Sequence, residues 1–169
     1  MIAIFLADGF EELEALTPVD VLLRELDGKV IKTVGVTGKT VTGTHGIKVI
    51  ADITVDELDL DSLEAAIFPG GMPGATNLDA SPYTDKIIEA VKKKGGVLAA
   101  ICAAPLIFGR RGLLSGKCAT CFPGFEGELV GATVLNDNVV RDGDIVTAKN
   151  FRCSLEFADT LARVIKAKG

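Results

Sequence analysis

The stretch from residue 97 to residue 105 most constrains how this chain can fold. Its first five residues, 97–101, are all apolar and predict a buried strand in the middle of an α/β sheet. Cys102 follows this strand directly, and Pro105 suits the first turn of a helix. Cys102 is therefore expected on a tight strand-to-helix turn, where unpaired amides stabilise a thiolate and lower the thiol pKa. This arrangement is a nucleophile elbow with sulfur in place of the serine oxygen, and an inert buried cysteine is the alternative.

Composition sets the class of protein. The chain has 169 residues, of which 48% are hydrophobic and 24% charged, so we expect one globular domain over residues 1–169. The net charge of −5 argues against a nucleic-acid or anionic-membrane surface. The apolar start, residues 1–8, lacks a basic leader and is expected to be a strand rather than a signal peptide. Four cysteines in such a chain predict reduced thiols and a cytoplasmic location.

Strand and helix patterns alternate along the chain, which predicts a mostly parallel sheet with helices on both faces. Strands are expected at residues 1–8, 30–36, 47–51, 65–68, 97–101, 117–120 and 131–135, with a hairpin at 139–146. Helices are expected at residues 11–26, 81–94, from 105 onward and from 154 onward, with residues 56–63 a loop or short helix. The helix at 11–26 should bury Leu13, Leu16, Val19, Leu23 and Leu26, with Pro18 either kinking or restarting it.

Three unusual turns should meet at one edge of this sheet, because turns that leave parallel strands share an edge. One turn holds Cys102. Another opens a helix with Glu11, Glu12 and Glu14. Glu11 and Glu12 suit the helix dipole, whereas Glu14 lies one turn in among apolar neighbours. A buried Glu14 carboxyl would stay protonated, and could donate to the Cys102 thiolate or move a substrate proton.

The last of these turns, residues 69–74, contains the pair Gly70 and Gly71. A double glycine by itself indicates only a turn. Beside a nucleophile, however, its exposed amides could stabilise an oxyanion. The chain has neither a Walker lysine motif nor a G-x-G-x-x-G run, so no nucleotide cofactor is predicted.

The remaining cysteines and the single histidine suggest no metal site. Cys118 and Cys121 form a C-x-x-C at the end of an expected strand, where residues three apart face opposite ways. A local disulfide is therefore not expected, and a lone C-x-x-C makes a poor zinc site. His45 lies in a turn and is interpreted as a structural residue, although a cysteine–histidine dyad would have to use it.

Taken together, residues 7–14, 17–20, 68–71, 99–105 and 155–158 resemble the ThiJ/PfpI superfamily, and most closely the branch of the parkinsonism-associated protein deglycase. The resemblance implies a flavodoxin-like three-layer sandwich and a homodimer. It implies Cys102 as nucleophile, Glu14 as its protonated partner, and the amides of Gly71 and Ala103 at the site. Activities reported in the family are cofactor-free conversion of methylglyoxal to lactate, repair of glycated proteins or nucleotides, redox sensing and chaperoning.

The chain departs from that branch at two places. Cys121 stands where some members carry a site histidine, and residues 150–153, ending in Cys153, replace a Gly-Pro-Gly-Thr loop. Cys121 and Cys153 are therefore candidates for site-lining or resolving thiols, and protease chemistry is disfavoured. Two hypotheses follow. The chain is either a cofactor-free enzyme for a small reactive carbonyl or glycated substrate, or a non-catalytic redox-sensing or chaperone-like protein that uses oxidation of Cys102.

Overall fold

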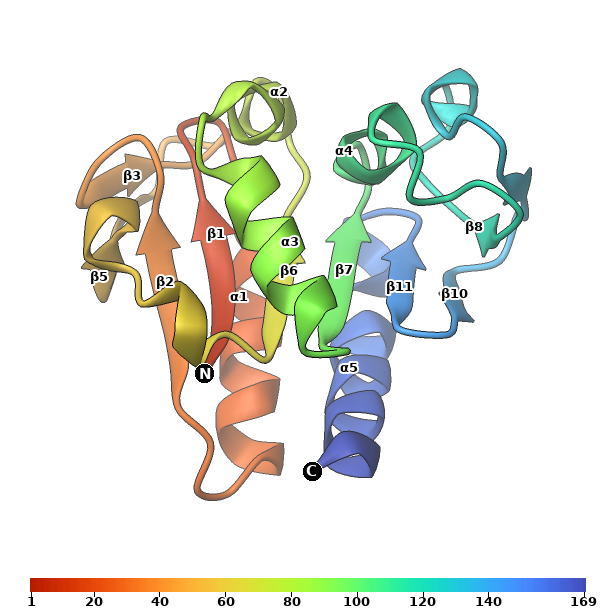
Figure 1. The fold of residues 1–169 in the computed structure, drawn as a ribbon. Coiled ribbons are helices and arrows are strands. Elements are labelled where there is room, and N and C mark those ends of the chain that lie inside the picture. Colours follow the sequence, from red (N-terminus) through yellow and green to blue (C-terminus); the bar gives the residue numbers. More distant parts are fainter.

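A seven-stranded sheet forms the centre of the computed structural model, which describes residues 1–169 (Figure 1). The strand order is β10-β11-β7-β6-β1-β2-β5, and every neighbouring pair is parallel except β10 with β11. The strands are β1 (Ile2–Leu6), β2 (Ile31–Gly35), β5 (Ile53–Thr54), β6 (Ala65–Phe68), β7 (Val97–Ile101), β10 (Val139–Asp142) and β11 (Ile145–Ala148). The predicted mostly parallel sheet is confirmed.

Helices cover both faces of this sheet. On one face lie α1 (Glu12–Glu25) and α5 (Ser154–Lys168), and on the other lie α2 (Gly74–Ala80), α3 (Thr84–Lys93) and α4 (Pro105–Arg110) (Figure 1). Each face has its own apolar core, of 25 buried residues on the α2–α4 side and 20 on the α1–α5 side. The flavodoxin-like sandwich is therefore confirmed, and strands such as β1 and β7 are fully buried because both of their faces are covered.

Several short elements were not predicted from the sequence. A hairpin of β3 (Thr40–Thr42) and β4 (Lys48–Ile50) lies where only one strand was expected, and α2 and β5 were not predicted. Two 3-10 turns, Val55–Glu57 and Leu60–Ser62, occupy the segment expected to be a loop or short helix. The small parallel pair β8 (Cys118–Ala119) and β9 (Thr133–Val134) agrees with the prediction. Strands of two or three residues, such as β3 and β5, are too short to show a period, and the seven residues of α2 begin with glycine, a poor helix former.

Helix α1 runs through Pro18 without restarting, and its predicted inward face is wrong at Leu13, Leu16 and Leu23 but correct at Leu26 and, in part, at Val19. Leu13 and Leu23 are 52% and 59% exposed, whereas Ala15 and Leu22 are buried. The buried face follows Glu14, Pro18 and Leu22, which are four residues apart. On this face the Glu14 carboxyl reaches the sheet edge and accepts a hydrogen bond from the Gly70 amide. In α5, Leu155 is 60% exposed.

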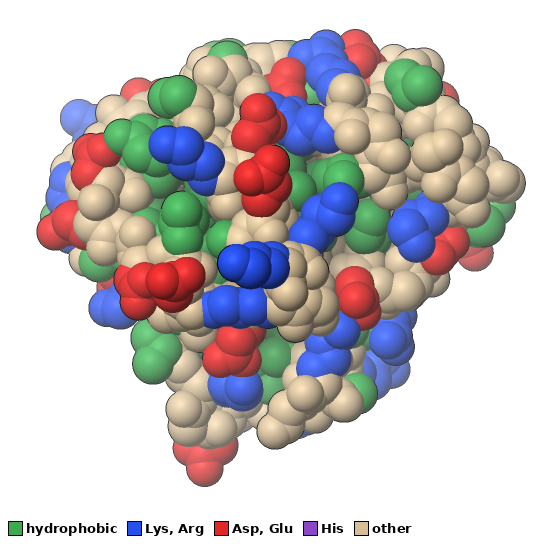
Figure 2. Space-filling view, in the orientation of Figure 1, with side chains coloured by type: hydrophobic (Ala, Val, Ile, Leu, Met, Phe, Trp, Pro, Cys, Tyr) green, Lys and Arg blue, Asp and Glu red, His purple; other side chains and the backbone are tan.

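Helix α3 begins at Thr84, three residues later than predicted, because Ser81 and Pro82 form a turn before it. Its last turn carries Lys92 and Lys93, which suit the helix dipole, and Gly95 follows in the left-handed region at φ +63°. On the α2–α4 face of the molecule, lysine and arginine side chains are interspersed with aspartate and glutamate (Figure 2). No helix combines the length and the apolar character needed to cross a membrane.

Candidate active site

The three turns predicted to share the carboxyl edge of the sheet are in direct contact. The amide of Glu11 donates to the carbonyl of Gly70 at 2.9 Å, which joins the turn after β1 to the turn after β6. A Cβ on Gly70 would lie only 2.5 Å from Glu14 Oε2 and 2.6 Å from Cys102 Cβ. Gly70 therefore lies between the acid and the cysteine, and its lack of a side chain lets them approach each other.

Cys102 has an unusual backbone. It lies between β7 and α4 with φ +65°, and it is the one non-glycine residue of the chain with a positive φ. An L-residue in this region costs about 1–2 kcal/mol. Two hydrogen bonds hold the turn, one from the Cys102 amide to Ala148 at 2.9 Å and one from the Phe122 amide to the Cys102 carbonyl at 2.8 Å. Backbone strain of this kind is concentrated at functional sites in proteins.

Glu14 is a buried acid with one oxygen unused. Its side chain comes from the first turn of α1, and the residue is 1% exposed. Oε2 accepts a hydrogen bond from the Gly70 amide at 2.9 Å, whereas Oε1 has no hydrogen-bond partner. Burial raises the pKa of Glu14 to about 8, with a further increase from the charge of Glu11, against the lowering effect of hydrogen bonds to Cys102 and Gly70. The carboxyl is thus mostly protonated at neutral pH, as expected.

The thiol of Cys102 does not have the low pKa predicted from its position. Burial, and then the charge of Glu14, raise the pKa of Cys102 to about 12, while the amides of Gly71 and Ala103 lower it. The predicted direction is wrong because α4 spans only 6 residues and burial outweighs the contribution of the amides. The same interactions do show that the Gly71 and Ala103 amides act on the sulfur, as expected.

Glu14 and Cys102 must titrate as a pair, because each acts on the pKa of the other. Glu14 raises the thiol pKa only while it carries a negative charge. When Glu14 holds the proton, the same carboxyl becomes a hydrogen-bond donor, and a donor favours the thiolate. The pair can therefore lose its first proton at a lower pH than its second. The resulting negative charge lies either on the Glu14 oxygen or on the Cys102 sulfur. This arrangement can present a nucleophilic sulfur next to a neutral acid.

Gly70, Cys121 and Cys153 were also predicted to contribute to the site. The amide of Gly70 already donates to Glu14, so it is not free to bind an oxyanion as expected. Cys121 is buried and lines a cavity of 260 Å³, and burial and the charge of Glu126 raise its pKa to about 11. Cys153 is also buried, with its sulfur 3.6 Å from Asn150 Oδ1. All four cysteines are free thiols.

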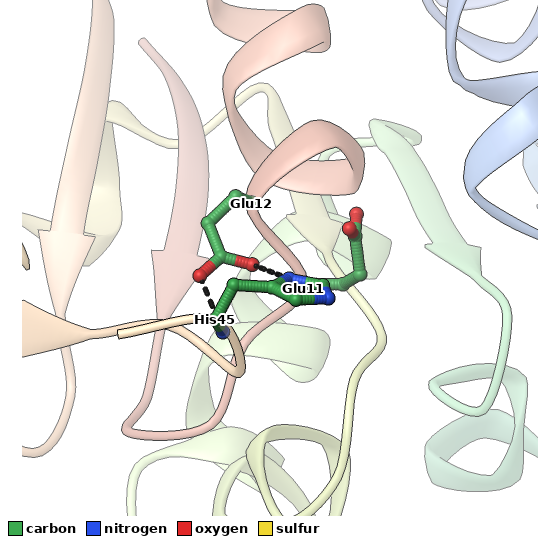
Figure 3. Close-up of side chains that lie close together, drawn as sticks. All are labelled: Glu11, Glu12 and His45. Carbon is green, nitrogen blue, oxygen red and sulfur yellow. Dashed lines mark hydrogen bonds and ion pairs between the residues drawn. The ribbon is translucent and has the colours of Figure 1, made fainter. Parts of the chain in front are cut away.

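His45 forms a contact that the sequence did not reveal. Its Nδ1 lies 2.8 Å from Oε2 of Glu12, so the ring pairs with a carboxylate of α1 and not with Cys102 (Figure 3). Glu11, Glu12 and His45 have potential ligand atoms within 4.8 Å of one another. Both oxygens of Glu12 already accept hydrogen bonds from the turn at 43–46, and Oε2 of Glu11 accepts the Glu14 amide. We therefore interpret the group as an ion pair rather than a metal site.

Comparison with known proteins identifies the family of the chain. The model of the DJ-1/PfpI family matches residues 1–164. The chain belongs to the DJ-1/PfpI family. It is 36% identical over 165 residues to the DJ-1 homolog B of Arabidopsis thaliana, covering 96% of this chain but only 37% of the length of that protein. The crystal structure of Drosophila melanogaster DJ-1beta superimposes with a TM-score of 0.90 at 29% identity, covering 97% of this chain and 89% of that one.

Two further relatives in the family have names that refer to an activity. A deglycase of Pyrococcus abyssi is 30% identical over 154 residues, covering 88% of this chain and 89% of that protein. A glutathione-independent glyoxalase of Caenorhabditis elegans is 28% identical over 150 residues, covering 88% of this chain and 78% of that protein. These DJ-1/PfpI relatives support an activity on reactive carbonyls in the family, at a level of identity that leaves the individual reaction open.

Proposed function

We propose that the chain is a cysteine-dependent, cofactor-free enzyme that acts on reactive carbonyl compounds, either converting methylglyoxal to lactate or repairing glycated adducts. The observation that carries this proposal is the buried, protonated Glu14 carboxyl beside the strained Cys102 turn, with one carboxyl oxygen unused. The names of the archaeal deglycase and the nematode glyoxalase support the same class of substrate.

The proposed reaction starts from the singly ionised pair, in which Cys102 is a thiolate and Glu14 holds the proton, and the thiolate attacks an aldehyde carbon. A C–S bond forms, the carbonyl electron pair moves to oxygen, and that oxygen takes the proton of Glu14. The amides of Gly71 and Ala103, which already act on the sulfur, would stabilise the negative charge during this step. Gly70 has a different role, because its amide holds Glu14 in place.

Glu14 then acts as a base. Its carboxylate removes the proton from the same carbon, and the adduct passes through an enediol to a thioester when a proton is returned to the neighbouring carbon. Water hydrolyses the thioester, which releases lactate and restores the thiol. The oxidation of one carbon is balanced by the reduction of its neighbour, so the reaction needs no external oxidant or reductant.

Turnover of small dicarbonyls by the purified protein tests this function. Methylglyoxal is incubated with the wild type, with Cys102→Ser and with Cys121→Ser, and lactate is followed by NMR. We expect lactate with the wild type and with Cys121→Ser, and a loss of about 10³-fold or more with Cys102→Ser. Glycated amino acids are the second substrate class to be assayed. An absence of turnover on both classes would contradict the proposal, as would full activity of Cys102→Ser.

Redox sensing is the second candidate function, because Cys102 is the thiol that combines partial exposure with contacts to two amides and an acid. Mild peroxide should then oxidise Cys102 before the other cysteines, to a sulfinic acid or to a disulfide with Cys121 or Cys153. Peptide mass spectrometry distinguishes these products. Earlier oxidation of another cysteine would exclude this function, and dicarbonyl turnover by the wild type would favour the enzyme.

We also propose that the chain forms a homodimer, and that it is cytoplasmic, as its four free thiols suggest. Leu13, Leu16 and Leu23 are exposed on one face of α1, which is an unusual surface for a monomer. Light scattering at micromolar concentration should show a dimer for the wild type and a monomer for Leu13→Glu. Val130→Glu, at an exposed apolar residue elsewhere, is the matched control and should stay dimeric. A monomeric wild type would contradict this proposal.

A further inference from the structure

The turn of residues 43–46, between β3 and β4, encloses the Glu12 carboxylate. The His45 amide donates to Glu12 Oε1 at 2.8 Å, and the Thr44 hydroxyl donates to Oε2 at 3.1 Å. The His45 ring completes the set with Nδ1 at 2.8 Å from Oε2 (Figure 3). A Cβ on Gly43 would overlap the same carboxylate, so the turn fits closely around it. As a result Glu12 is 6% exposed although it carries a charge.

The same turn holds the segment that carries Glu14. The Thr44 amide donates to the carbonyl of Phe10 at 2.9 Å, on the side of the segment facing the β3–β4 hairpin. On its other side, the Glu11 amide donates to Gly70 at 2.9 Å. Oε2 of Glu11 accepts the Glu14 amide at 2.8 Å. A continuous set of contacts therefore runs from His45 through Glu12 and α1 to Glu14 and the Cys102 turn.

The His45 ring also brings a positive charge to an acidic helix start. Hydrogen bonding and charge from Glu12, with a smaller contribution from Glu11, raise the pKa of His45. Burial raises the pKa of Glu12, but its hydrogen bonds to His45 and Thr44 outweigh this and lower it. Glu11 also raises the pKa of Glu14. Glu11 and Glu12, both at the start of α1, are the charged groups that act on His45.

We propose that His45 is a positioning residue of the Cys102 site: it holds Glu12, and thereby keeps the start of α1 and the Glu14 carboxyl in register with Gly70 and Cys102. The catalytic meaning of this role rests on the proposed function.

The test measures iodoacetamide labelling of Cys102 by peptide mapping across pH 5–10 in the full chain. His45→Gln removes the charge and ring, His45→Lys keeps a positive charge, and Glu12→Gln removes the partner. Lys48→Gln is the matched control, because Lys48 is an exposed charge on the same hairpin with no ion pair. We expect His45→Gln and Glu12→Gln to slow labelling at pH 7 by about two- to threefold or more and to shift the profile to higher pH, because a displaced Glu14 carboxyl no longer donates to the thiolate.

His45→Lys should stay near the wild-type rate at neutral pH, and Lys48→Gln should match the wild type throughout. Gly43→Ala tests position without a change of charge, and should alter the labelling of Cys102 because its methyl group displaces Glu12. Profiles for His45→Gln and Glu12→Gln that superimpose on the wild type would overturn the proposal. Because the readout is alkylation, that result is independent of the lactate assay, which alone decides the proposed function.

Discussion

The two edges of the central sheet differ in a way that shows where the chemistry of this chain lies. The amino edge has a hollow of 450 Å³ bounded by Lys92, Lys117 and Ile145, and another of 210 Å³ near the C-terminus. The carboxyl edge has a hollow of 260 Å³ beside Cys121, and it also holds the strained Cys102 and a buried carboxyl with an unused oxygen. In parallel α/β sheets ligands bind at the carboxyl edge.

Glycines show the same contrast. Gly95 and Gly112, at the amino edge, have positive φ but nothing within 4 Å of an added Cβ, so they only make turns. Gly70 and Gly71, at the carboxyl edge, would place a Cβ 2.5 Å from Glu14 and from the backbone of Glu11 and Gly9. Gly96, at the amino edge, is also tightly enclosed, with the Glu64 carbonyl 2.3 Å from an added Cβ, so Gly70 differs in that its close neighbours are the Glu14 carboxyl and Cys102.

Glu14→Gln should give the largest effect on the carboxyl edge. Gln keeps the shape and can still accept the Gly70 amide, but it cannot transfer a proton. We expect dicarbonyl turnover to fall by about 10²–10³-fold, the usual contribution of a general acid or base. Asp144→Asn, which changes an exposed acid at the amino edge, should keep wild-type turnover. Equal activity of wild type and Glu14→Gln would reduce Glu14 to an acid at the start of a helix.

A pair of glycine substitutions compares the two edges directly. Gly70→Ala should cost about 1–3 kcal/mol of folding free energy through overpacking and lower turnover by about 100-fold by displacing Glu14 and Cys102. Gly112→Ala should cost about 1–2 kcal/mol for its positive φ and leave turnover within about twofold. Denaturant unfolding and lactate assays measure both. Comparable losses of turnover would show that activity follows stability and not the site.

The pH dependence of stability sharpens the assignment of Glu14. The unfolded carboxyl ionises near pH 4.5, whereas the folded one keeps its proton to about pH 8. Between these two pH values the unfolded state binds fewer protons than the folded state. The contribution of Glu14 to the unfolding free energy is therefore lost as the pH rises from about 4.5 to about 8. Glu14→Gln cannot ionise, so it does not lose stability in this way. The unfolding free energy of Glu14→Gln minus that of the wild type should therefore increase from pH 5 to pH 8 by on the order of 1–3 kcal/mol. A difference independent of pH would contradict the raised pKa.

Backbone strain at Cys102 gives the smallest predicted effect. Cys102→Gly and Cys102→Ala both remove the sulfur, but only glycine adopts φ +65° without cost. The glycine variant should be more stable than the alanine variant by about 1 kcal/mol, the reverse of the usual order in a folded element. Chemical denaturation of the two proteins provides the measurement. A more stable alanine variant would mean that the Cys102 turn is unstrained.

The long helices and strands could be predicted from the sequence, and so could the convergence of the three turns at one edge of the sheet. Continuous apolar runs marked β1, β6 and β7, and the parallel order then brought Glu14, Gly70 and Cys102 to one edge. The inward face of α1 could not be predicted from hydrophobicity alone, because that face carries a buried carboxylic acid while Leu13 and Leu23 are exposed.

Three features of the site depend on contacts between distant segments. The pairing of His45 with Glu12 joins residues 33 positions apart, and no local pattern marks it. The use of the Gly70 amide by Glu14 joins residues 56 apart. The thiol pKa was predicted from the helix N-terminus alone, and burial and the neighbouring acid reverse its direction.

The most direct test of the shared proton is the pH profile of alkylation of all four cysteines, mapped by peptide in the wild type and in Glu14→Gln. If Glu14 and Cys102 share one proton, Cys102 should be alkylated faster than the other three cysteines near neutral pH. Its rate should show an inflection at about pH 8, where the pair ionises. Glu14→Gln should abolish that inflection. A Cys102 rate that climbs steadily toward pH 12, the same in both proteins and no faster than that of Cys121, would contradict the account.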